Sequence, residues 1–98
     1  MPTTTLDELR ARRDEILQVA RARGATRVRV FGSVARGDST ESSDVDFLVD
    51  LEPGRSLLDL GGLLMDLQDL LNRDVDVATE RGLRPRVAHR VLADAIEL

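Results

Sequence analysis

The run from residue 30 to residue 50, VFGSVARGDSTESSDVDFLVD, constrains the fold more than any other part of the chain. A β-branched apolar segment, a glycine-bearing turn, a polar loop and a second β-branched segment indicate two strands joined by a turn and a loop. The second segment carries Asp44 and Asp46. Because side chains at positions i and i+2 of a strand share a face, both carboxylates lean into one space, with Cα atoms about 6.6 Å apart.

These residue types suit the binding of a metal and a phosphate. Hard divalent cations take oxygen ligands, and two carboxylates can hold one Mg²⁺ or flank a pair of ions. Gly32 and Ser33 follow the first strand directly, where backbone N–H groups and a hydroxyl can meet phosphate oxygens. Arg36, in the loop after this turn, is a candidate phosphate ligand, and a solvent-facing arginine is an equal alternative.

Patterning along the rest of the chain predicts alternating helices and strands. A capping box at Thr5 opens a helix that Gly24 ends in a left-handed conformation. The helix capped by Ser56 carries a leucine stripe that predicts a core-facing surface. The further predicted elements are strands at 26–31, 45–51 and 73–79, a helical turn at 33–36, helices at 57–71 and 83–93, and a short strand or tail at 95–98.

A third carboxylate, Asp76, lies between two valines and has the same local pattern as Asp46. If the two strands are neighbours, Asp44, Asp46 and Asp76 converge on one face. Three carboxylates so close repel one another and need a cation. Two Mg²⁺ ions would fit, or Asp76 would act as the base that takes a hydroxyl proton. The alternative is that surface strands carry aspartates for solubility and edge protection.

Composition narrows the class of protein. We expect one domain, residues 1–98, because the chain has 98 residues. There is no cysteine, so disulfides and thiolate zinc sites are excluded, and the net charge of −4 argues against nucleic acid as a direct partner. No apolar run is long enough to span a membrane, and the N-terminal stretch lacks the apolar core of a signal peptide. We therefore expect a cytoplasmic protein.

Taken together, these motifs resemble a known family. The glycine–serine pair, the Ser-Asp-Val-Asp run that contains Asp44 and Asp46, and Asp76 between its valines are similar to the signature of the DNA polymerase β-like nucleotidyltransferase superfamily. The run GSVARGDSTESSDVDFLVDL is most similar to the minimal nucleotidyltransferases, which are often antitoxin partners of HEPN-domain toxins. The resemblance covers essentially the whole chain.

The resemblance implies a fold, a site and a reaction. The implied fold is α+β, a small mixed β-sheet with helices packed on one face. Asp44, Asp46 and Asp76 would bind Mg²⁺, with two ions expected, and ATP would lie near Gly32 and Ser33. An acceptor hydroxyl, expected to be a tyrosine of the HEPN toxin, would receive AMP, and pyrophosphate would leave. The chain lacks the extra domain with which larger relatives hold base and acceptor, so the resemblance suggests that the partner completes the site.

Two other functions stay open at this point. The chain could be a non-catalytic antitoxin that neutralises its toxin by stoichiometric binding, in which case inhibition needs neither ATP nor the carboxylates. Transfer to a small molecule is the third alternative, which the absence of an evident acceptor pocket in one compact domain disfavours.

Overall fold

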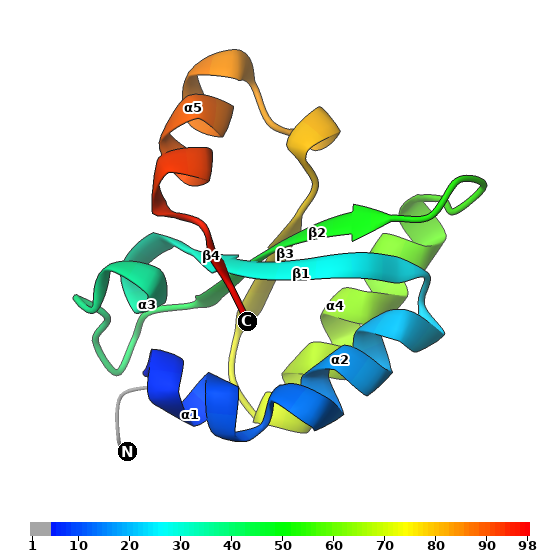
Figure 1. Cartoon of the computed structure of the whole chain (residues 1–98). Coiled ribbons are helices and arrows are strands. Elements are labelled where there is room, and N and C mark those ends of the chain that lie inside the picture. Colours follow the sequence, from blue (N-terminus) through cyan, green and yellow to red (C-terminus); the bar gives the residue numbers. More distant parts are fainter. Residues whose placement is uncertain (1–4) are drawn as a thin grey trace.

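The computed structural model describes residues 5–98, which form a four-stranded sheet with helices on both faces (Figure 1). The strands are ordered β3-β2-β1-β4. The elements in chain order are α1 (Leu6–Ala11), α2 (Arg13–Ala22), β1 (Ala25–Phe31), α3 (Gly32–Arg36), β2 (Val45–Leu51), α4 (Leu57–Leu71), β3 (Val75–Ala78), the 3₁₀ helix η1 (Glu80–Gly82), α5 (Pro85–Asp94) and β4 (Ile96–Glu97).

The sheet is mixed, as the family resemblance implies. Strand β1 pairs in antiparallel fashion with both β2 and β4, whereas β2 and β3 are parallel. Parallel neighbours require a crossover connection, because a tight hairpin reverses the chain direction. Helix α4 provides that crossover, and it returns the chain to the end of the sheet at which β2 starts.

One face of the sheet packs on α1, α2 and α4 and forms the core (Figure 1). The alternation along β2 assigns its faces as predicted: Val45, Phe47 and Val49 are buried in the core cluster. Helix α4 covers them with Leu63 and Leu67, which are also fully buried. The apolar face of β2 is thus fixed by the core, which obliges its aspartates to point to the other side.

The opposite face of the sheet, which carries the aspartates, is partly covered by α5, whereas the resemblance implies helices on one face only (Figure 1). Leu48 shares this face with Asp46 and is nevertheless fully buried. Helix α5 packs against α3 and β1, and its Val91 is buried. Helix α5 therefore covers part of the carboxylate-bearing face of the sheet, beside the end of β1 and the start of α3.

Two further features of the helices differ from the expectation. The first helix is broken at Arg12, whose φ of −108° and ψ of 19° end α1, while its guanidinium donates a hydrogen bond of 2.9 Å to the Leu70 carbonyl. The leucine stripe of α4 is not buried along its whole length. Leu57 and Leu58 are 83% and 86% exposed because the first turn of α4 lies outside the core cluster.

None of the helices within residues 5–98 has the length and apolarity that a bilayer crossing needs. The N-terminal stretch that lacks the apolar core of a signal peptide begins with residues 1–4. These four residues lie outside the described residues.

Candidate active site

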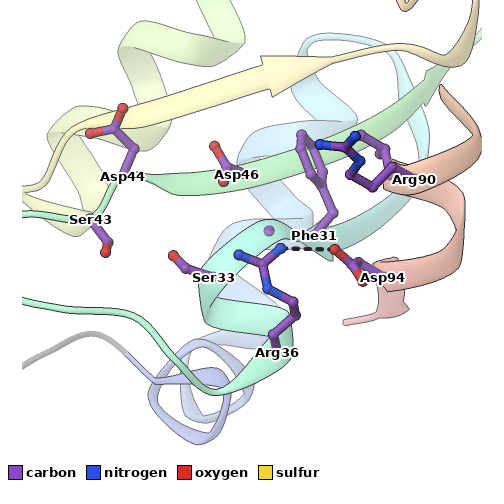
Figure 2. A pocket seen from close by; sticks show the side chains of 10 residues that line it. Phe31, Ser33, Arg36, Ser43, Asp44, Asp46, Arg90 and Asp94 are labelled. Carbon is purple, nitrogen blue, oxygen red and sulfur yellow. Dashed lines mark hydrogen bonds and ion pairs between the residues drawn. The ribbon is translucent and has the colours of Figure 1, made fainter. Parts of the chain in front are cut away.

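A cavity of about 440 Å³ opens between α3, the start of β2 and α5 (Figure 2). Five of the six residues that the sequence singles out line it, namely Gly32, Ser33, Arg36, Asp44 and Asp46. The remaining lining residues are Phe31, Ser43, Arg90, Val91 and Asp94. The glycine–serine turn and the Asp-x-Asp pair, which the polar loop separates in sequence, thus share one cavity.

Gly32 and Asp46 are in direct contact, and this contact explains the glycine. The backbone of Gly32 has a φ of +72°, in the left-handed region that side chains rarely adopt. A Cβ at this position would overlap Oδ2 of Asp46. The turn after β1 therefore has to be glycine so that the Asp46 carboxylate can lie against the backbone beside Ser33.

Asp46 is half-buried among other negative charges. Burial, and then the charges of Asp76 and Asp44, together raise its pKa from the ordinary 3.8 to about 6. The charge of Arg36 acts in the opposite direction, but it is the smallest of the four effects. The carboxylate therefore lacks sufficient positive charge around it, which is the condition that a bound divalent cation would relieve.

Asp76 lies next to this cavity, although it does not line it. Strand β3 places it directly beside Asp46 in the parallel register, on the same face of the sheet. Both Asp44 and Asp76 are exposed, whereas Asp46 is half-buried. The sequence prediction that two neighbouring strands carry these residues therefore matches the arrangement of the backbone.

The side chains as they stand do not form a metal cage. Within residues 5–98, no group of three or more His, Cys, Asp or Glu side chains is arranged to hold a metal ion. Two observations nevertheless fit Mg²⁺: the donor atoms are carboxylate oxygens, and the Asp46 charge is destabilised by burial and by its acidic neighbours. The residues present therefore suit a magnesium ion by their chemistry.

Arg36 points into the cavity from α3, where it is bound by carboxylates (Figure 2). Its Nη1 lies 2.8 Å from Asp94 on α5, and its Nε lies 3.3 Å from Asp38. The hydrogen bond to Asp94 is the largest of the effects that raise the pKa of Arg36. Arg36 is thus in position to meet a phosphate, although two of its three guanidinium nitrogens already face carboxylates.

Ser43 also lines the cavity, but its hydroxyl serves the loop. Its Oγ accepts a hydrogen bond of 2.8 Å from the backbone N–H of Thr40 and thereby closes the turn that leads into β2. This bond fixes the chain direction just before Asp44.

Sequence reasoning missed the contribution of α5. Arg90, Val91 and Asp94 form one wall of the cavity, and Phe31 lies at its base beside the turn. Helical spacing does reveal that Arg90 and Asp94 share one face of a helix. It does not reveal which face of the sheet that helix covers, so nothing in the sequence connected these residues with Asp46.

Comparisons with known proteins show the family to which this fold belongs. Residues 13–98 match the model of the family described as nucleotidyltransferase domain. The chain is 40% identical to the protein adenylyltransferase MntA of Thermococcus cleftensis over 74% of this chain and 74% of the relative. A solved structure of a provisionally assigned minimal nucleotidyltransferase is 52% identical, with a TM-score of 0.84 and coverage of 97% of both chains.

A more distant likeness concerns the fold alone. The complex of the tri-AMPylated HEPN toxin of Shewanella oneidensis with MNT antitoxin contains a chain that is 18% identical, with a TM-score of 0.68. The match covers 90% of this chain and 69% of that one.

Proposed function

The chain belongs to the nucleotidyltransferase domain family, and on that premise we propose that it transfers AMP from Mg–ATP to a hydroxyl of a partner HEPN toxin and so acts as an antitoxin. The 40% identity to a protein adenylyltransferase supports a protein as the acceptor. The shared fold with a complex of an AMPylated HEPN toxin supports that class of partner. A reaction that consumes ATP is consistent with a cytoplasmic location.

The observation that carries the proposal is the contact between Asp46 and Gly32. It brings a carboxylate of β2 against the turn that starts with Ser33, inside one cavity. A nucleotide has both a phosphate chain and a need for a metal, and this cavity offers groups for both within one small space. Asp44 lies at the same rim.

Each residue has a defined part in the proposed reaction. Gly32 and Ser33 orient the triphosphate through a backbone N–H and a hydroxyl, and Arg36 contributes positive charge to the phosphates. The acceptor oxygen, expected from a tyrosine, forms a bond to the α-phosphorus, and the bond from that phosphorus to the bridging oxygen breaks. Pyrophosphate leaves with the electron pair. The acceptor proton passes to a carboxylate, for which Asp76 is available because it is exposed beside Asp46.

Asp44, Asp46 and Asp76 would also hold magnesium, with two ions expected. Bound Mg²⁺ would stabilise the negative charge that develops on the phosphates and lower the pKa of the attacking hydroxyl. The positive charge of the ion would offset the burial and the repulsion that raise the pKa of Asp46. Asp76 can serve as ligand or as base, and both roles require its place in register with Asp46.

The test is to incubate the protein with Mg–ATP and a HEPN toxin from the same organism, and to follow the intact mass of the HEPN protein. We expect the mass to increase by that of an adenylyl group and the toxin to become inactive. Asp44→Asn and Asp46→Asn should abolish the mass change in folded protein, whereas Asp69→Asn, an exposed position on α4, should not. An unchanged toxin mass would contradict adenylyl transfer.

The same experiment separates the non-catalytic alternative. An antitoxin that only covers its toxin would inhibit it without ATP, and the Asp44→Asn and Asp46→Asn variants would inhibit equally well. Inhibition that requires both ATP and the carboxylates supports catalysis.

A further inference from the structure

Helix α5 supplies a second arginine to the cavity, and this arginine has no assigned role. Val91 is buried and fixes this part of the helix against the rest of the protein, while Arg90 beside it reaches the cavity (Figure 2). Asp94 lies one turn further on and also lines the cavity. The wall that α5 forms is therefore charged, with one positive and one negative group.

The two arginines that line the cavity differ in their ion-pair partners. Arg36 already has two carboxylate partners, Asp94 at 2.8 Å and Asp38 at 3.3 Å. The guanidinium group of Arg90, by contrast, has no hydrogen bond or ion pair with any residue in the range 5–98. The cavity is also lined by Asp44 and Asp46, so its carboxylates outnumber its guanidinium groups. Arg90 is thus the cation of this cavity that no internal partner neutralises.

We propose that Arg90 binds the phosphate chain of the nucleotide and is a further substrate-binding residue of this site. The inference rests on the proposed function, because it requires that ATP enters the cavity beside Ser33 and Asp46. An arginine with no internal partner can offer its whole guanidinium group to a phosphate, whereas Nε and Nη1 of Arg36 already face aspartates. Guanidinium groups also match phosphate oxygens with two parallel hydrogen bonds.

The test compares two arginines of the same helix. Arg86 lies one turn before Arg90, is likewise exposed, and does not line the cavity. Replacing either with alanine removes one charge from the same helix, so the pair separates contact with the nucleotide from a general change of charge. Arg90→Lys keeps the charge but loses the planar fork.

Equilibrium binding of a non-hydrolysable ATP analogue with Mg²⁺ is the measurement, with circular dichroism to establish that each variant is folded. We expect Arg90→Ala to weaken binding about tenfold, and Arg86→Ala to change it less than twofold. Arg90→Lys should restore part of the loss. Binding of adenosine, which has no phosphate, should be the same in all variants.

The outcomes distinguish this inference from the function on which it rests. If the wild-type protein binds the analogue and Arg90→Ala binds it as well as Arg86→Ala does, Arg90 is not a phosphate ligand while the proposed function stands. If adenosine binding falls in Arg90→Ala as much as analogue binding, the residue shapes the cavity and the inference is also wrong. If the wild-type protein binds no nucleotide, the proposed function fails and this inference fails with it.

Discussion

Replacing Asp46 with asparagine should stabilise the protein at neutral pH while it abolishes adenylyl transfer. Burial and the charges of Asp76 and Asp44 raise the pKa of Asp46 from 3.8 to about 6. At about 1.4 kcal/mol per pKa unit, this rise sets an upper limit of about 3 kcal/mol on the cost of the charge in the folded protein. Because Asp46 is only half-buried, solvent screening reduces the expected gain to about 1–2 kcal/mol.

The sign of the pH dependence follows from the direction of the shift. A carboxyl group with a raised pKa in the folded state favours folding while it is protonated, and that contribution is lost as the pH rises through the folded-state value. The wild-type protein should therefore lose stability relative to Asp46→Asn between about pH 4 and pH 6. Above about pH 7 the difference between the two should be constant.

Urea unfolding at pH 4.5 and at pH 7.5, with a chelator present to remove divalent cations, is the appropriate assay. In a thermal melt of a domain of this size, a gain of about 1–2 kcal/mol in the free energy of unfolding would raise the melting temperature of Asp46→Asn by about 4–16 °C. Asp69→Asn, an exposed substitution on α4, is the control for removal of one negative charge. An equal gain at both pH values, or no gain at pH 7.5, would refute the argument that Asp46 is destabilised by its surroundings.

Three further predictions concern single contacts. Gly32→Ala should lower the free energy of unfolding by at least about 1–2 kcal/mol and abolish nucleotide binding, because the new Cβ overlaps Asp46 at a φ of +72°; calorimetry would measure both. Gly61→Ala on α4 should raise the free energy of urea unfolding by up to about 1 kcal/mol, since its Cβ would meet nothing within 4 Å, and a loss would contradict the open space there. Asp94→Asn should tighten binding of the ATP analogue about two- to fivefold because it releases Arg36, and unchanged affinity would indicate that this ion pair does not compete with phosphate.

The part of the site that the sequence predicts is the part that strand alternation controls. Once Val45, Phe47 and Val49 face the core, Asp46 must face the other side, so its orientation is a direct consequence of the pattern. Asp76 repeats the pattern on β3, and the parallel pairing of β2 with β3 then places the two carboxyl groups on the same face. Local periodicity and one pairing are sufficient for this much.

The wall of the cavity could not be predicted in the same way. Helical spacing places Arg90 and Asp94 on one face of α5, but it does not specify the surface against which Val91 packs. The break at Arg12 has a similar origin. Its guanidinium donates a hydrogen bond to a carbonyl oxygen of α4, 58 residues away in the sequence. Such a long-range contact does not show in the hydrophobic periodicity of the sequence.

The crossover through α4 has a consequence for how the protein acquires and loses activity. Asp46 and Asp76 are neighbours in the sheet, and the segment of chain that joins their strands contains α4. Docking of this helix depends on Leu63 and Leu67, which are fully buried at the centre of the core. We therefore expect nucleotide binding to disappear in the same cooperative transition in which the helices melt.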